Sequence, residues 1–137
     1  MGTQAVYREQ QHELQRTMRP STIMKIDAYS FGFMSIDGKG YSTDLIIYPD
    51  GEVRSGWWRI QGHKLVPDDL ERMDEFKPNV IVIGTGSNGR MTVPNDTVRY
   101  LRMICDELII EDTDEAVRRF NALSGSGSII GMFHLTC

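Results

Sequence analysis

Short apolar runs separated by tight turns fill the first half of the chain. Residues 28–36 and 45–48 are rich in apolar and aromatic side chains, and residues 52–60 form a third such run. The sequences Asp-Gly-Lys-Gly at 37–40 and Pro-Asp-Gly at 49–51 lie between these runs. In such turns proline presets φ and glycine accepts a positive φ. The pattern predicts three antiparallel strands arranged as a β-meander.

In the second half, helical periodicities alternate with strand patterns. Pro67 and large apolar residues at every third position up to Phe76 predict a helix. The uninterrupted apolar run at 80–83 is typical of a strand buried on both faces. Further helices are expected at 96–105 and 113–123, and further strands at 108–110 and 129–136.

The order of these elements predicts one α/β domain at residues 25–137. A strand–helix–strand–helix–strand series folds through right-handed crossovers, which make its strands parallel. We therefore expect a three-layer α/β fold, with an antiparallel β-meander followed by β-α-β-α-β in a mixed central sheet flanked by helices. Residues 1–24 are rich in glutamine and poor in apolar side chains, and we interpret them as a polar N-terminal tail. Residues 1–22 are expected to make few contacts with the domain.

Charge and cysteine content argue against several partners and locations. With 15 Lys and Arg against 19 Asp and Glu, the net charge is −4, which disfavours nucleic acid and anionic membranes as partners. No apolar run approaches the ~18 residues of a transmembrane helix. The two cysteines, Cys105 and Cys137, are too few for a disulfide framework, which favours a reducing, cytoplasmic location.

The sequence Gly84-Thr85-Gly86-Ser87-Asn88-Gly89 fits the G-x-G-x-x-G pattern and directly follows a predicted strand. Glu111 follows about 20 residues later, where a dinucleotide fold holds a ribose hydroxyl. Residues 90–94 nevertheless separate the glycines from the next helix, so no helix N-terminus faces a pyrophosphate. The alternative is a wide turn at the end of a strand, which is still a place where α/β sheets bind ligands.

We therefore treat this loop as a candidate ligand site with a crevice beside the strand end. Backbone N–H groups near Gly86 to Gly89 are expected to be free to meet an anion or a polar ligand, and the hydroxyl, amide and guanidinium groups of the loop would add donors. A Gly86→Val change should impair binding if Gly86 faces an open cleft, and destabilise the fold if Gly86 packs against a neighbour. The candidate residues are Gly84, Thr85, Gly86, Ser87, Asn88 and Arg90, with Thr113 and Asn121 from the last helix.

A second candidate site surrounds two adjacent tryptophans. Neighbours on a strand point to opposite faces, so one of Trp57 and Trp58 should be buried and the other exposed. An exposed Trp beside Arg59 and His63 would suit a protein partner. The alternative, that both rings are covered, stays open.

Cysteine and histidine chemistry gives weaker signals. His134 and Cys137 are three residues apart, but no other Cys–His pair completes a set of four metal ligands, so no metal is expected. His134 shares an apolar strand face and is interpreted as a hydrogen-bonded core residue. Cys105 falls on the apolar stripe of a helix and is interpreted as inert packing.

Several short motifs occur together in the chain. They are 41–48 followed by Pro-Asp-Gly, Ile-Val-Ile-Gly-Thr-Gly at 81–86, Asp112-Thr113 with 115–117 and 120–121, and the closing His-Leu-Thr-Cys. In these motifs the chain resembles a family of small, largely uncharacterised domains that includes mitochondrial complex I assembly factor 3, an adipogenesis-associated relative, and bacterial and archaeal proteins. The resemblance implies a three-layer α/β fold and no established enzymatic activity. Gly125-Ser126-Gly127 replaces the acidic–Gly–basic turn of many relatives, so an anion pocket that uses that basic residue is not expected.

These features favour a non-catalytic binding or assembly accessory domain with a small cleft at the 84–90 loop. No base, nucleophile and metal set converges in the sequence, and no cofactor is expected. The partner would be a protein or a small anionic ligand, and the chain would act as a monomer or weak homodimer. The alternative is a small-molecule enzyme or nucleotide-binding protein that uses the same glycine-rich loop.

Overall fold

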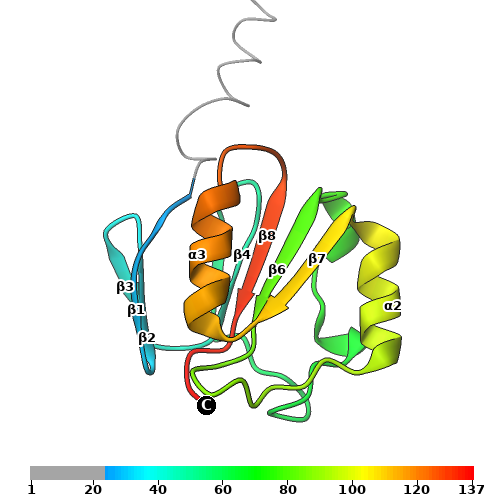
Figure 1. The fold of residues 1–137 in the computed structure, drawn as a ribbon, viewed down its shortest axis with the longest axis horizontal. Coiled ribbons are helices and arrows are strands. Elements are labelled where there is room, and N and C mark those ends of the chain that lie inside the picture. The colour runs from blue at the N-terminus through cyan, green and yellow to red at the C-terminus, as the bar shows by residue number, and fades with distance from the viewer. Residues whose placement is uncertain (1–23) are drawn as a thin grey trace, which may run out of the picture.

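Two β-sheets and two α-helices organise residues 24–137, the part of the chain that the computed structural model describes (Figure 1). A small antiparallel sheet contains β1 (Ile26–Ser30), β2 (Phe33–Ile36) and β3 (Lys39–Tyr41). The larger sheet contains β4 (Leu45–Ile47), β5 (Val53–Ser55), β6 (Val80–Gly84), β7 (Glu107–Glu111) and β8 (Ile129–Phe133). The helices are α2 (Asn95–Ile104) and α3 (Thr113–Leu123), and two 3-10 helices, η2 (Pro67–Asp69) and η3 (Met73–Glu75), precede β6.

The predicted α/β fold with a mixed central sheet flanked by helices is confirmed. The strand order of the large sheet is β5-β4-β8-β6-β7, so β8 occupies its centre. β8 pairs in parallel with β6 and antiparallel with β4. The hairpin of β4 and β5 and the pair of β6 and β7 are thus joined through the last strand. The proposed tail lies outside the described residues except for Met24, whose side chain is buried.

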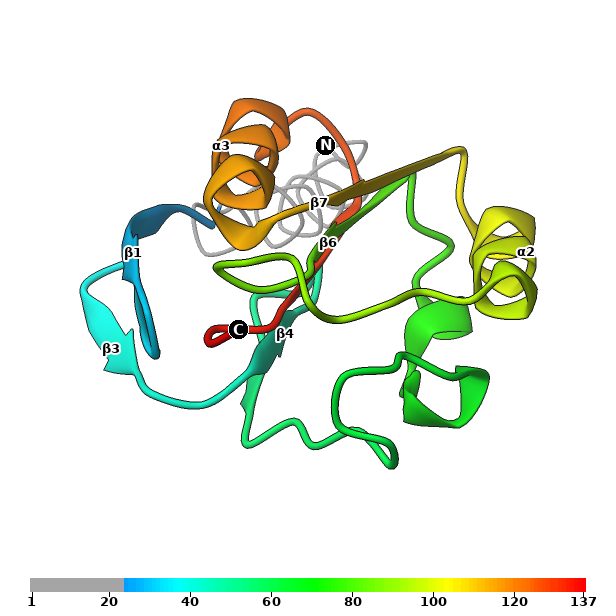
Figure 2. The same cartoon turned by 60° about the horizontal axis from the view of Figure 1, so that its bottom comes forward.

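Each face of the large sheet supports its own apolar core, because alternate side chains point to opposite sides. On one face, Val82 and Phe133 pack beneath α3 and the small sheet. On the other face, Ile83 and Met132 pack beneath α2 and the long connection between β5 and β6. The sheet is therefore the middle of three layers (Figures 1 and 2).

A glycine in β8 allows α3 to lie close to the sheet. A Cβ atom on Gly131 would lie 2.9 Å from Phe120 of α3 and 2.6 Å from Phe133. In the space that Gly131 leaves, the rings of Phe120 and Phe133 meet edge to face at 5.8 Å. Asp112 fixes the start of α3, since its carboxylate accepts the backbone N–H of Glu115 at 2.9 Å.

The first-half strands differ from the sequence prediction. The run at 28–36 is two strands rather than one, because Gly32 adopts φ +77° and turns the chain between β1 and β2. A second turn at Asp37 and Gly38, both with positive φ, leads into β3. The meander is therefore β1-β2-β3, and the predicted strand at 45–48 belongs to the other sheet.

Two other predicted elements are shorter than expected. The third strand ends at Ser55 instead of residue 60, because Gly56 adopts φ +67°. The predicted helix at 67–76 is two separate 3-10 turns, interrupted where Arg72 takes a left-handed conformation at φ +60°. Within the described residues, no helix is long and apolar enough to cross a membrane.

The contact at Gly131 can be tested by adding one methyl group. Gly131→Ala should destabilise the fold by about 1–3 kcal/mol, because the added Cβ overlaps Phe120 and Phe133. Urea denaturation measures this change. In a Phe120→Leu background the same substitution should cost less, and an equal cost in both backgrounds would contradict the packing account.

Candidate functional site

The carboxyl ends of the three parallel strands β6, β7 and β8 lie at one edge of the large sheet. In α/β sheets this edge is where ligands usually bind. The glycine-rich loop leaves β6 at this edge, α3 begins there after β7, and residues 134–137 continue from β8. Figure 2 shows the loop and the C-terminal residues next to each other.

Residues 134–137 hold the glycine-rich loop through backbone hydrogen bonds. The N–H of Ser87 donates to Thr136 O at 2.6 Å, and the N–H of Arg90 donates to Cys137 O at 2.9 Å. The N–H of Gly89 donates within the loop to Gly86 O at 3.1 Å. These N–H groups are therefore occupied within the chain and are not presented to an anion.

The two central glycines of the loop provide close packing. Thr113 Oγ1 accepts the N–H of Gly86 at 2.8 Å and donates to His134 O at 2.7 Å. A Cβ on Gly86 would lie 2.4 Å from the backbone of Cys137, and Gly86 has φ +111°. A Cβ on Gly84 would lie 2.8 Å from Thr113 Oγ1. Of the two expectations for Gly86, the structure favours packing against a neighbour. The prediction of free N–H groups near Gly86 is wrong, because they are hydrogen-bonded within the chain.

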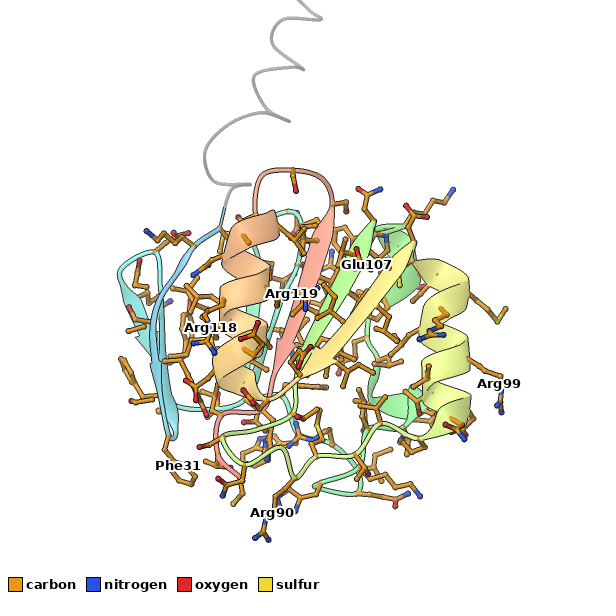
Figure 3. All side chains as sticks on the ribbon, viewed as in Figure 1. Phe31, Arg90, Arg99, Glu107, Arg118 and Arg119 are labelled. Carbon is orange, nitrogen blue, oxygen red and sulfur yellow. The ribbon has the colours of Figure 1, made fainter. Side chains whose placement is uncertain are left out.

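The other residues predicted for this site are dispersed. Thr85 Oγ1 donates to Glu111 O at 3.0 Å, and Asn88 is exposed. Arg90 points away from the domain (Figure 3). Asn121 lies about 12 Å along α3 from Thr113 at 1.5 Å per residue. Its amide instead bonds the backbone N–H and C=O of Ile26 at 2.9 and 2.8 Å, which attaches β1 to α3.

A buried polar cluster beside the loop was not predicted as a unit. His134 Nδ1 lies 2.8 Å from Asp44 Oδ2, and Arg59 Nη2 donates to the same oxygen at 2.6 Å. The second carboxylate oxygen of Asp44 accepts the N–H of Leu135 at 2.7 Å. The side chains of Arg59, His134 and Asp44 are only 4%, 5% and 12% exposed. We call these three side chains the Asp44 cluster.

The hydrogen bonds to Asp44 keep its carboxylate ionised. Burial alone would raise the pKa of Asp44, but hydrogen bonds from His134, the Leu135 N–H and Arg59 outweigh burial and hold this pKa below 3.8. An ionised Asp44 accepts only, so His134 Nδ1 carries the hydrogen that it shares with Asp44 Oδ2. In a neutral imidazole, Nε2 is then left as a hydrogen-bond acceptor.

Two buried nitrogens of the Asp44 cluster have no partner. They are Arg59 Nη1 and His134 Nε2, the two unpartnered buried side-chain atoms among the described residues. A buried polar atom left without a hydrogen bond costs about 1–3 kcal/mol. The interpretation of His134 as a hydrogen-bonded core residue therefore accounts for Nδ1 but leaves Nε2 unexplained.

Tyr29 links the small sheet to the same segment. Its hydroxyl donates to Leu135 O at 2.8 Å, and the N–H of Gly32 donates to the same oxygen at 2.8 Å. Burial raises the pKa of Tyr29 to about 12, so the hydroxyl keeps its proton at neutral pH.

The prediction that one of the two adjacent tryptophans is buried and the other exposed is confirmed. Trp57 is 1% exposed and donates from Nε1 to Asp69 O at 3.1 Å, whereas Trp58 is 79% exposed. Both residues follow the end of β5, so loop geometry rather than strand alternation separates them. Arg59 packs over the Trp57 ring at 4.9 Å, and the exposed His63 meets the His134 ring edge to face at 5.3 Å.

Neither the position of Cys105 nor a metal-binding cluster of side chains supports cysteine chemistry in the described residues. Cys105 is half-buried at the end of α2, and burial raises the pKa of its thiol. Residues 24–137 contain no group of three His, Cys, Asp or Glu side chains arranged to hold a metal ion.

Comparison with known proteins gives a family and several similar folds. Residues 26–134 match a family described as proteins of unknown function, DUF498/DUF598. A conserved hypothetical protein of Pyrococcus horikoshii is 30% identical, with a TM-score of 0.73 over 82% of this chain and 99% of that chain. A Xanthomonas campestris protein is 21% identical, with a TM-score of 0.63 over 82% and 84% of the two chains. A Bordetella pertussis protein described as a Mth938-like domain is 21% identical, with a TM-score of 0.57 over 83% and 87%.

Removing the charge of Asp44 tests how far the cluster supports the fold. Asp44→Asn should destabilise the protein by about 3 kcal/mol, because Arg59 then loses its buried counter-charge. Urea denaturation at neutral pH measures the change. Asp74→Asn, at an exposed acid of η3, should change stability by less than about 0.5 kcal/mol.

The same carboxylate predicts a specific pH dependence. The pKa of Asp44 is lower in the folded protein than its ordinary value of 3.8. The ionised carboxylate therefore stabilises the folded protein at pH values above 3.8. That stability is lost as the pH falls through the depressed folded value. The difference in unfolding free energy between the wild type and Asp44→Asn should thus be constant near neutrality and shrink below 3.8. A difference that stays constant into strong acid would contradict this assignment.

Proposed function

We propose that this chain, which belongs to the DUF498/DUF598 family of proteins of unknown function, is a non-catalytic binding domain that offers residues 56–64 to a protein partner. One observation carries the proposal. Trp58 is 79% exposed and Ile60 is 70% exposed. Their neighbours in the sequence, Trp57 and Arg59, have buried side chains that anchor the segment in the domain. Large exposed apolar side chains that project from a fixed base are typical of protein-binding surfaces.

The anchoring of this loop supports a binding role. Arg59 Nε donates to Gly62 O at 2.5 Å, and Gly62 N donates back to Arg59 O at 3.3 Å. The N–H of Ile60 donates to Asp69 Oδ1 at 2.9 Å. A loop that is already ordered loses little conformational entropy on association, so more of the contact energy of Trp58 is available for affinity.

We extend the proposal to an assembly accessory role, in which the partner is a protein that this domain helps to assemble. The resemblance to a family that includes complex I assembly factor 3 supports this extension, and neither complex I nor a mitochondrial location is part of it. We also propose that this protein is cytoplasmic and acts as a monomer or weak homodimer. Cys105 and Cys137 are free thiols, which suits a reducing compartment.

Replacing Trp58 tests the binding surface. A photo-reactive residue at position 60 would capture the partner in cells, and the purified partner would then be titrated calorimetrically with the unmodified domain. Trp58→Ala should weaken this binding at least about 30-fold, as truncation of a central aromatic contact does. The fold should be unchanged because the side chain is exposed.

Met103→Ala is the matched control, because Met103 is 82% exposed on α2, away from the loop. It should bind like the wild type. Equal affinity of Trp58→Ala and the wild type, or an equal loss in Met103→Ala, would contradict the proposed surface.

A further inference from the structure

We infer that Arg59 and His134 form a buried site for one small oxyanion, a carboxylate or phosphate group, and that binding brings a proton onto His134. The site lies beneath residues 56–64 rather than on the exposed surface of this segment. It goes beyond the proposed protein-binding function, because Trp58 and Ile60 take no part in it.

The unpartnered nitrogens define the site. Arg59 Nη1 and His134 Nε2 are both buried without a hydrogen-bond partner, on side chains that are 4% and 5% exposed. Arg59 Nη2 lies 3.1 Å from His134 Nδ1, and both groups are rigid and planar. The two side chains that carry the unpartnered nitrogens are therefore in direct contact.

The remaining atoms of both side chains are already engaged. Arg59 uses one N–H of Nη2 on Asp44 and the N–H of Nε on Gly62 O, which leaves Nη1 as its nitrogen without a partner. His134 uses Nδ1 on Asp44. A ligand at this point must accept hydrogen bonds from Nη1, and oxyanions are strong acceptors for guanidinium groups.

Charge balance determines the coupling to a proton. An ionised Asp44 and Arg59 cancel, so the Asp44 cluster is neutral while His134 is neutral. An added anion would leave one uncompensated negative charge in a buried place, which is strongly unfavourable. A proton on His134 restores neutrality and turns Nε2 from an acceptor into a donor that the anion can accept.

Asp44, Arg59 and His63 are the titratable or charged side chains that contact His134. The backbone carbonyl of Cys137 lies beside the same ring, since a Cβ on Gly86 would be 2.4 Å from it. On the loop side, Gly86 lies close to the ring, since a Cβ there would be 2.9 Å from His134 Cδ2. Because His63 is exposed, the ring of His134 lies one residue below the surface on that side.

Calorimetry with sodium formate and with inorganic phosphate tests the site. Each titration is run at about pH 8, where histidine is ordinarily neutral, in two buffers of different ionisation enthalpy. We expect one anion per chain with uptake of close to one proton, and an affinity that falls about tenfold per pH unit on the alkaline side. The relative affinity for formate and phosphate identifies which oxyanion fits.

Nuclear magnetic resonance of the imidazole nitrogens provides an independent readout. Without anion, His134 should carry hydrogen on Nδ1 alone, and saturation with the tighter probe should protonate Nε2 as well. An unchanged imidazole in the presence of bound anion would overturn the proton coupling, and no binding of either probe would overturn the site in favour of buried water.

Matched variants separate this site from general surface attraction. His134→Asn keeps a donor near the Nδ1 position for Asp44 but removes Nε2, so the domain should stay folded and lose anion binding. Arg59→Lys keeps the charge, shows whether the guanidinium geometry is needed, and should weaken binding at least tenfold. Arg99→Gln removes an exposed charge that points outward from α2 and should bind like the wild type (Figure 3).

Wild-type affinity in His134→Asn, or an equal loss in Arg99→Gln, would overturn the inference. Thermal unfolding of each variant without anion shows whether a loss of binding reflects a loss of fold. If His134→Asn does not fold, Arg59→Lys and the imidazole spectra of the wild type still decide the question. None of these measurements depends on Trp58, so their failure would leave the proposed protein-binding surface unaffected.

Discussion

Most of the structure depends on the hydrogen bonding of β8, the strand that lies between β4 and β6. Without it, the hairpin of β4 and β5 has no partner in the large sheet. The residues that follow β8 extend the same dependence beyond the sheet. Through their backbone groups they hold the glycine-rich loop, the N-terminus of α3 and the hairpin of β1 and β2. A single segment thus sets the relative positions of nearly all the parts that surround the carboxyl ends of the parallel strands.

The register of β8 also builds the Asp44 cluster. Leu45 pairs with Phe133, so the next positions outward bring Asp44 opposite His134. A slip of one residue would move His134 to the other face of the sheet and separate it from Asp44 and Arg59. The cluster therefore discriminates against wrong registers, a role for which buried polar groups are known. The side chains that depend on this register include Arg59 and His134, the two that we propose as an anion site.

Sequence patterns predicted the elements whose signals are local. The apolar run of β6 and the periodicity of α2 and α3 gave nearly correct bounds, because burial of each element follows its own residues. The long predicted strand at 28–36 failed because the conformation of Gly32 alone decides the turn. The Asp44 cluster could not be predicted, since Asp44 and His134 are 90 residues apart and only the sheet register joins them. A charged residue directly before one strand and a histidine directly after another were its only local signs.

The central position of β8 has a consequence for how the protein reaches this state. While a chain folds, β4 and β6 both present open edges until β8 becomes available, and closing this sheet requires contacts across 90 residues. Such non-local pairing slows folding, and exposed strand edges are sites of intermolecular association. Until β8 inserts, the open edges of β4 and β6 are thus sites for association between chains. Changes that weaken β8 would lower the yield of folded protein even where they leave the finished structure stable.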